Sequence, residues 1–160
     1  MRNVEYQAPT VIGRAKVKGV ASRKFCLFDP GVARALAGRL REPLDSVERG
    51  FLLETWVLHE LRAAMAALNT GGQLHYWRTP SGTEVDFIWT RGRRTIGIEV
   101  KAASTWRSEY GTALRGLVEQ GMVTAAHGVY TGTVERKDGS LRIWPIKSFL
   151  RELATGTILG

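Results

Sequence analysis

The chain has 160 residues, of which 44% are hydrophobic, which suits one compact domain with a buried core. No stretch reaches the roughly 18 uncharged apolar residues that a transmembrane helix requires. The first ten residues also lack the apolar segment of a secretory signal, and the single Cys26 excludes an internal disulfide. These features exclude a helical membrane protein and predict a cytoplasmic location.

The formal net charge is +8 and the isoelectric point is near 10.1. A surplus of positive charge attracts phosphate backbones and makes their binding dependent on salt. The basic residues are scattered along the chain, however, and many small basic domains bind no nucleic acid. The charge is therefore compatible with nucleic-acid binding but does not establish it.

The first 49 residues are predicted to form a lead-in that packs on the rest of the chain. Residues 11–20 favour a ragged strand or an ordered arm, and Lys24–Phe28 favour a short buried strand. Asp29 is a typical N-cap, and it predicts a short helix over residues 31–40. A polar connection follows this helix.

From Phe51 onward, helices and strands alternate, and residues 50–160 are predicted to form the core of the domain. We expect a long helix, three strands, a second helix, two strands and a closing helix, over residues 51–68, 74–79, 83–90, 95–102, 108–120, 124–132, 141–146 and 147–153. This order predicts an α/β fold with a central mixed β-sheet flanked by helices.

Polar residues interrupt the apolar pattern in the second and third predicted strands. A hairpin that closes around residues 92–93 places Asp86 opposite Glu99, and Glu84 opposite Lys101. Side chains alternate between the faces of a strand, so Glu99 and Lys101 share one face. The inferred register therefore brings Asp86, Glu99 and Lys101 together.

Two carboxylates that face each other repel unless a cation neutralises them. Mg²⁺, or Mn²⁺ in its place, binds one or two protein carboxylates, keeps several waters and shares its shell with a phosphate. Lys101 could orient the attacking water or stabilise charge on the phosphate. The simpler alternative is a solvated strand face on which Lys101 pairs with Glu84.

The long predicted helix carries further carboxylates near its apolar stripe. Glu60 falls within this stripe and Glu54 falls at its edge, whereas Thr55 falls on the polar side. Glu54 is the favoured site residue because the start of the helix is expected to approach Asp86, with Glu60 about 9 Å further along the axis. Glu60 is the alternative helix carboxylate, and an arginine is expected to hold it. The predicted stripe runs through Trp56, Val57, Leu61, Ala64 and Leu68.

Three short motifs resemble the PD-(D/E)XK nuclease superfamily, which has the restriction-endonuclease-like fold. They are GFLLE at residues 50–54, EVDF at 84–87 and IEVK at 98–101. More narrowly, KFCLFDPGVARAL, GFLLETWVLHEL, YWRTPSGTEVDFI and IEVKA are similar to the DUF4143 domain, which usually ends bacterial and archaeal ATPases. The resemblance extends from about Lys24 to Leu153.

This resemblance implies that Mg²⁺ binds between Asp86 and Glu99, that Glu54 assists from the helix, and that Lys101 acts near the attacking water. It also implies an ATPase domain in the same or a larger polypeptide as a partner. The chain contains no G-x-x-x-x-G-K-[ST] motif, so we expect it not to bind ATP through a P-loop. It is expected to be the C-terminal part of such an ATPase.

Arg78 and Trp106 flank the predicted site and are candidates for contact with nucleic acid, the first with phosphate and the second by stacking on bases. The alternative for Trp106 is a place in the core. The leading hypothesis is Mg²⁺-dependent hydrolysis of DNA phosphodiesters by Asp86, Glu99, Lys101 and Glu54. The alternatives are a non-catalytic module that binds nucleic acid or protein, and a structural domain whose acidic face is solvated.

Overall fold

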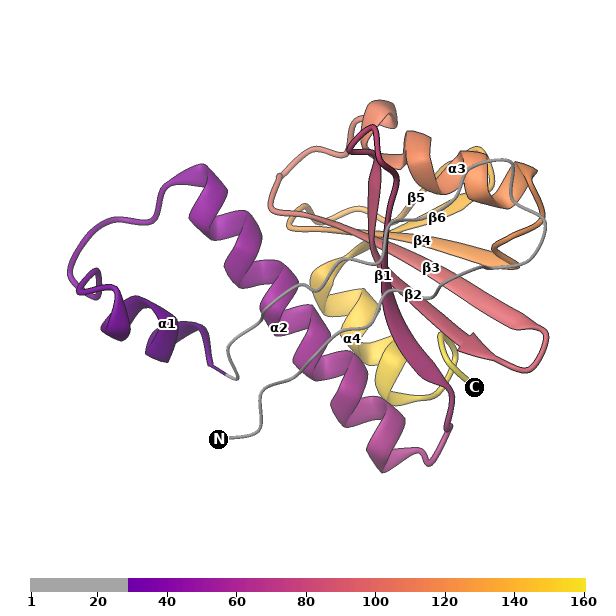
Figure 1. The fold of residues 1–160 in the computed structure, drawn as a ribbon, viewed down its shortest axis with the longest axis horizontal. Coiled ribbons are helices and arrows are strands. Elements are labelled where there is room, and N and C mark those ends of the chain that lie inside the picture. Colours follow the sequence, from indigo (N-terminus) through magenta and orange to yellow (C-terminus); the bar gives the residue numbers. More distant parts are fainter. Residues whose placement is uncertain (1–28) are drawn as a thin grey trace.

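The computed structural model describes residues 29–160 and shows a twisted mixed β-sheet with helices on both faces (Figure 1). Within this range the α-helices are α1 (Pro30–Leu36), α2 (Ser46–Ala67), α3 (Thr112–Glu119) and α4 (Ile146–Ala154), with a 3-10 helix, η1 (Ser108–Gly111). The strands are β1 (Gln73–Arg78), β2 (Glu84–Arg91), β3 (Arg94–Lys101), β4 (Ala125–Tyr130), β5 (Arg136–Asp138) and β6 (Leu141–Pro145). The predicted α/β class with a central mixed sheet is confirmed.

The strands lie in the order β1-β2-β3-β4-β6-β5. β1, β2 and β3 form an antiparallel meander, whereas β3, β4 and β6 run parallel to one another. A parallel connection needs a crossover, and η1 with α3 supplies it between β3 and β4. β3 is therefore a central strand with an antiparallel neighbour on one side and a parallel neighbour on the other.

Two apolar clusters cover the two faces of this sheet. α2 and α4 pack on the face that carries Trp89, Ile98 and Trp144. α3 packs on the opposite face, against Ile88 and Ile143. In Figure 1, α3 lies above the sheet, and α2 and α4 lie below it. Each face of β3 is covered, so any polar group on it must be paired or must border a cavity.

The lead-in and the core meet within a single helix. α2 begins at Ser46, where the carboxylate of Asp45 caps it by accepting a hydrogen bond from the Glu48 amide. The boundary expected between residues 49 and 50 thus falls inside α2. α1 contacts α2 and lies beside its first half (Figure 1). The predicted strands over residues 11–20 and Lys24–Phe28, together with Cys26, lie outside the described residues.

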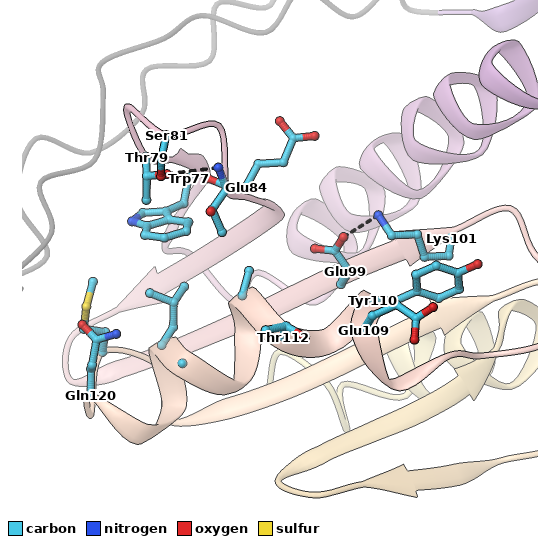
Figure 2. Close-up of a pocket in the computed structure, with 15 residues that line it drawn as sticks. Trp77, Thr79, Ser81, Glu84, Glu99, Lys101, Glu109, Tyr110, Thr112 and Gln120 are labelled. Atoms are coloured by element: carbon cyan, nitrogen blue, oxygen red, sulfur yellow. Dashed lines mark hydrogen bonds and ion pairs between the residues drawn. The ribbon is translucent and has the colours of Figure 1, made fainter.

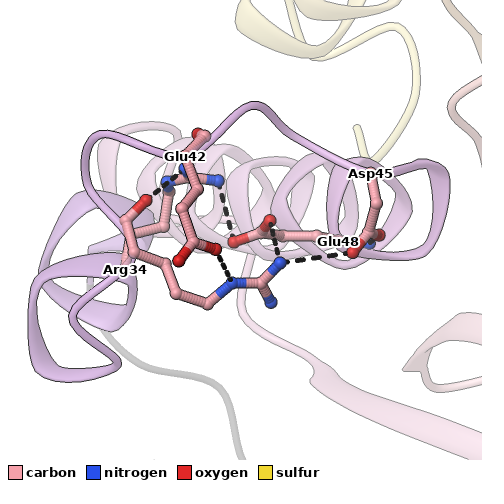
Figure 3. A network of polar contacts seen from close by, with 5 residues as sticks. Arg34, Glu42, Asp45 and Glu48 are labelled. Atoms are coloured by element: carbon pink, nitrogen blue, oxygen red, sulfur yellow. Dashed lines mark hydrogen bonds and ion pairs between the residues drawn. The ribbon is translucent and has the colours of Figure 1, made fainter.

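A network of arginines and carboxylates holds α1 against α2 (Figure 3). Arg34 forms an ion pair of 2.8 Å with Glu48, and its guanidinium also donates to the backbone oxygens of Arg39 and Glu42. Arg39 pairs in turn with Glu42 and Asp45. The Arg34 and Glu48 side chains are only 11% and 13% exposed, so this pair is largely sequestered from water. It fixes the loop between the two helices.

The structure differs from the prediction in several elements. α1 ends at Leu36 and not at residue 40, and α2 begins at Ser46 and not at residue 51. The helix expected over residues 108–120 is divided into η1 and α3, and a short strand, β5, was not predicted. β5 has only three residues and pairs with β6 at the sheet edge. A strand of this length has too few residues to display an alternating pattern, so only its pairing defines it.

The predicted apolar stripe of α2 is partly wrong. Trp56 is 43% exposed and Leu68 is also exposed, whereas Thr55, expected on the polar side, is buried. The Thr55 hydroxyl donates to the backbone oxygen of Phe51, which satisfies it inside the protein. The buried positions of α2 are Leu53, Thr55, Val57, Leu58, Leu61 and Ala64.

Among the described helices, none combines the length with the apolar composition needed to cross a membrane.

Candidate functional site

The predicted hairpin register is confirmed from Arg91 to Phe87. Arg91 pairs with Arg94, and the pairing continues without a shift to Phe87 opposite Ile98. The regular pairing then stops one residue before Asp86 and Glu99 would face each other. Asp86 and Glu99 therefore lie where β2 and β3 cease to form a regular ladder.

Asp86 is 2% exposed, and its side chain bonds to β3 just beyond the last regular pair of the β2–β3 ladder. Its Oδ2 accepts a hydrogen bond of 2.8 Å from the backbone amide of Val100 on β3. A side-chain carboxylate thus takes the position that a backbone carbonyl would occupy in a continued ladder. This bond orients Asp86 toward the part of β3 that carries Glu99.

Glu99 lies on the α3 side of β3 and is 4% exposed. Its Oε1 forms an ion pair of 2.5 Å with the Lys101 ammonium, while its Oε2 is buried and accepts no hydrogen bond within the described residues. Burial, together with the charge of Asp86, raises the pKa of Glu99 to about 8. The negative charge of ionised Glu99 is therefore only partly compensated within the site.

The pKa of Lys101 is raised as well, although burial acts on it in the opposite direction. Burial lowers the pKa of Lys101, but the negative charges of Glu99, Asp86 and Glu54 outweigh it, and the net pKa is raised. Lys101 therefore remains protonated and supplies one positive charge to this acidic group. The predicted convergence of Asp86, Glu99 and Lys101 is present in the structure.

Glu99 and Lys101 line a cavity of about 650 Å³ (Figure 2). Its floor is apolar and includes Trp77, Leu117 and Met122. Its rim carries hydroxyl groups from the turn between β1 and β2 and carboxylates from three elements. The polar lining residues are Thr79, Ser81, Thr83, Glu84, Glu99, Lys101, Glu109, Tyr110, Thr112 and Gln120.

Glu54 enters from α2 on the other side of Lys101. It lines a second cavity, of about 420 Å³, together with Lys101, Ala103 and Tyr110. The influence of Glu54 on the pKa of Lys101 shows that its charge reaches the site. Glu54 is thus beside the predicted site, across Lys101 from Glu99.

Two carboxylates have partners other than those expected. Glu60 accepts a hydrogen bond of 2.9 Å from the indole of Trp56 one turn earlier on α2, and not from an arginine. Glu84 accepts a hydrogen bond from the Tyr76 hydroxyl and lies opposite Arg78 in the β1–β2 ladder. Because the β2–β3 ladder ends at Phe87, Glu84 does not face Lys101 in a strand pair.

Trp106, predicted to stack on bases, is a core residue. It is buried, and its indole donates a hydrogen bond of 3.0 Å to Asp138. Its ring covers Gly128 of β4, the residue paired with Glu99. The ring is therefore not a free stacking surface. Arg78, the other predicted contact, is exposed at the end of β1.

A divalent cation such as Mg²⁺ requires oxygen ligands, which carboxylates supply. Within residues 29–160, no group of three or more acidic, histidine or cysteine side chains is arranged to hold a metal ion. Asp86 and Glu99 remain as a pair of carboxylates, and Glu99 has one buried oxygen without a hydrogen bond. This pair fits a hydrated Mg²⁺, which requires only one or two carboxylates, and does not fit a cation that needs a full protein cage.

Sequence reasoning did not identify the basic residues that approach this site from α2 and from the segment after β3. Arg49 and Arg107 line a third cavity, of about 390 Å³, with Tyr110 and Thr131. Arg49 is on a helix and Arg107 is in a loop more than fifty positions later, so no local pattern joins them. Only the packing of α2 beside the end of β3 brings them together.

A protein-family model described as a domain of unknown function, DUF4143, matches residues 49–149, which is more than half of the chain. The chain belongs to the DUF4143 family. No curated relative matches it. The matched region of this DUF4143 domain includes most of α2, the three antiparallel strands and all of Glu54, Asp86, Glu99 and Lys101.

Proposed function

We propose that this DUF4143 domain is a nuclease of the PD-(D/E)XK type that hydrolyses DNA phosphodiesters with Mg²⁺ or Mn²⁺. The observation that carries the proposal is the position of Asp86 and Glu99, buried side by side at the open end of the β2–β3 ladder. The wall of a cavity of about 650 Å³ includes Glu99 and Lys101, so the group borders a space that a substrate can enter.

The charge balance of this group supports a cation as its partner. Glu99 is almost fully buried, and the Lys101 ammonium pairs with its Oε1, whereas its Oε2 accepts no hydrogen bond within the described residues, so its negative charge is only partly compensated. The resulting deficit is reflected in the raised pKa of Glu99, about 8. A divalent cation would remove this deficit and allow both carboxylates to ionise at neutral pH.

In this proposal each residue has a defined role. Asp86 and Glu99 would hold the cation, and the Val100 amide fixes the orientation of Asp86. The cation would lower the pKa of a bound water and offset charge on the phosphate. The Lys101 ammonium, which is one-third exposed, donates a hydrogen bond to the attacking water or to a phosphate oxygen. Glu54 adds negative charge on the opposite side and contributes to the raised pKa of Lys101, after the larger effects of Glu99 and Asp86.

A non-catalytic module that binds nucleic acid or protein is the second candidate. It is favoured by the ion pair between Glu99 and Lys101, which already satisfies part of the site, and by the very low exposure of Asp86 and Glu99. In that case the acidic group is structural, and the surrounding cavities serve recognition. The proposed partner in both cases is an ATPase domain of the same or a larger polypeptide.

The test measures Mg²⁺ and Mn²⁺ binding by calorimetry and cleavage of single-stranded and duplex DNA by the wild type and by Asp86→Asn. We expect saturable binding at millimolar or lower metal and metal-dependent cleavage, with both lost in Asp86→Asn. Binding without cleavage, or neither activity in the wild type, would favour the non-catalytic module.

The helix carboxylate is tested by a matched pair on α2. Glu54→Gln should reduce cleavage about tenfold or more, because it removes charge beside Lys101. Glu60→Gln should leave cleavage unchanged, because Glu60 bonds to Trp56. The opposite ranking of these two variants would show that the assignment of Glu54 is wrong.

A further inference from the structure

Three cavities adjoin one another around Tyr110. The cavity of about 650 Å³ and the one of about 420 Å³ share Lys101 and Tyr110. The latter shares Ala102, Ala103 and Tyr110 with the cavity of about 390 Å³. The three cavities are therefore neighbours around the end of β3, Lys101 lines the first two, and we refer to the three together as the groove.

The two ends of this groove differ in chemistry. The first end has an apolar floor that includes Trp77 and Met122, and a rim of hydroxyls and carboxylates. Its volume of about 650 Å³ can hold a nucleobase with its sugar, and the rim can pair with the edge of the base.

The second end is basic and polar. Arg49 and Arg107 line it together with the hydroxyls of Ser104, Thr105 and Thr131. Within the described part of the chain, Arg49 has no carboxylate within 4.0 Å, and Arg107 reaches only the exposed Glu109 at 4.0 Å. Such an exposed pair is weak, so both guanidinium groups are available to a phosphate.

We infer that this groove binds a single-stranded segment of nucleic acid. A base enters the cavity at Trp77, a backbone phosphate lies at Lys101, and a neighbouring phosphate lies between Arg49 and Arg107. The inference rests on the proposed function in one respect: it takes nucleic acid to be the ligand of the site. It adds that the nucleic acid is single-stranded and that Arg49 and Arg107 form a subsite for one of its phosphates.

The recessed position of the carboxylates favours a single strand over a duplex. Asp86 and Glu99 are 2% and 4% exposed, so a phosphodiester reaches them only if the strand bends into the groove. A base stacked inside a duplex cannot enter a cavity unless it is first extruded, at a cost of a few kcal/mol. An unpaired strand avoids this cost.

The first experiment measures binding of a fluorescent oligodeoxythymidylate by anisotropy, in EDTA so that cleavage does not occur. We expect Arg49→Ala/Arg107→Ala to weaken binding about tenfold or more and to lower the salt-dependence slope by about 0.7, the value for one phosphate of a single strand. The matched control, Arg91→Ala/Arg93→Ala, removes the same charge from the exposed hairpin at the far end of β2 and β3 and should bind as the wild type does.

Equal losses in the two double variants would overturn the phosphate subsite, because they would indicate diffuse surface charge. Equal affinity for a duplex of the same length would overturn the choice of a single strand. Absence of wild-type binding would overturn the whole inference.

The second experiment fills the base cavity. Gly116 lies on α3 beside this cavity, and a Cβ there meets only the end of Gln120, at 3.9 Å. Gly116→Leu should therefore preserve the fold and reduce oligonucleotide binding severalfold. Unchanged binding in a folded Gly116→Leu protein, as judged by circular dichroism, would exclude this cavity as the base site.

These outcomes can be separated from those of the nuclease proposal. Loss of binding in Arg49→Ala/Arg107→Ala, in a protein that cleaves no DNA with Mg²⁺ or Mn²⁺, would retain the groove and reject catalysis. Metal-dependent cleavage with unchanged binding in this variant would retain catalysis and reject the groove.

Discussion

At the scale of single residues, the ionisation of Glu99 links the candidate site to the stability of the protein. Its pKa in the folded protein is about 8, whereas its ordinary value is 4.5. Between these two values the folded protein binds more protons than the unfolded chain. The stabilising contribution is fully present below pH 4.5 and is lost as the pH rises through about 8.

Glu99→Gln should therefore stabilise the metal-free protein at alkaline pH. Relative to the wild type, we expect a gain of about 1 to 3 kcal/mol near pH 8 and little difference near pH 5, since one unit of pKa corresponds to about 1.4 kcal/mol. Urea denaturation at the two pH values, in EDTA, measures this difference. A gain of equal size at both pH values would show that the ionisation of Glu99 is not its cause.

At the scale of elements, close packing of α3 on β3 sets the wall of the site. Gly97 shares the α3-side face of β3 with Glu99, and a Cβ at Gly97 would lie 2.2 Å from Cδ1 of Leu114. The buried Leu114 side chain, or α3 with it, would have to shift to admit any side chain there. The absence of a side chain at Gly97 thus allows α3 to cover the strand that carries Glu99 and Lys101.

Gly97→Ala should destabilise the fold by about 1 to 3 kcal/mol, because it overpacks this contact. Gly116→Ala, in the same helix–strand unit but with space around its Cβ, should instead stabilise α3 by about 0.5 to 1 kcal/mol. Chemical denaturation of both variants measures the two changes. A neutral Gly97→Ala would show that α3 adjusts easily, contrary to this packing argument.

The attachment of α1 depends on the ion pair between Arg34 and Glu48. Arg34→Ala leaves the largely buried Glu48 without its nearest cation, and it also removes the donor to the loop carbonyls. Hydrogen exchange should become about tenfold or more faster in residues 30–45, with protection of β3 unchanged. Uniform loss of protection across the sheet would show that α1 is integral to the core.

At the scale of the whole molecule, two buried groups oppose each other in their response to pH. Burial, aided by the charge of Arg142, lowers the pKa of His127 to about 4, and its Nδ1 accepts a hydrogen bond from the Trp144 indole. Between its ordinary value of 6.5 and about 4, the unfolded chain binds more protons, so stability falls as the pH falls.

We therefore expect the metal-free protein to be most stable at mildly acidic pH. From 4.5 to 6.5 the opposite slopes from Glu99 and His127 offset each other, and above 6.5 only the loss from Glu99 remains. Thermal denaturation should show a plateau in the first range and a decline toward pH 8. Under the proposed function, Mg²⁺ should reverse the decline in the wild type but not in Asp86→Asn. Stability that rises from pH 6.5 to 8 in EDTA would contradict the assigned ionisation of Glu99.

The sequence predicted local structure well where an element is long and has a regular pattern. The β2–β3 hairpin followed from alternation and a short turn, and its register is correct to Phe87. Trp56 was misplaced because its indole bonds to Glu60 at the surface, an interaction that hydrophobicity does not predict. Trp106 was a candidate for base stacking with the core as the alternative, and no local pattern could decide between them because the partner of its indole, Asp138, lies 32 residues later.

The sequence by itself determined the α/β class and the order of the main helices and strands, since these follow from local patterns along the chain. It also determined the approach of Asp86, Glu99 and Lys101, since this depends on alternation within one hairpin. Only the tertiary structure decided how deeply Asp86 and Glu99 are buried, and that Arg49 and Arg107 line one cavity. These properties arise from contacts between elements far apart in the chain, and the packing of α2 and α3 against β3 determines them.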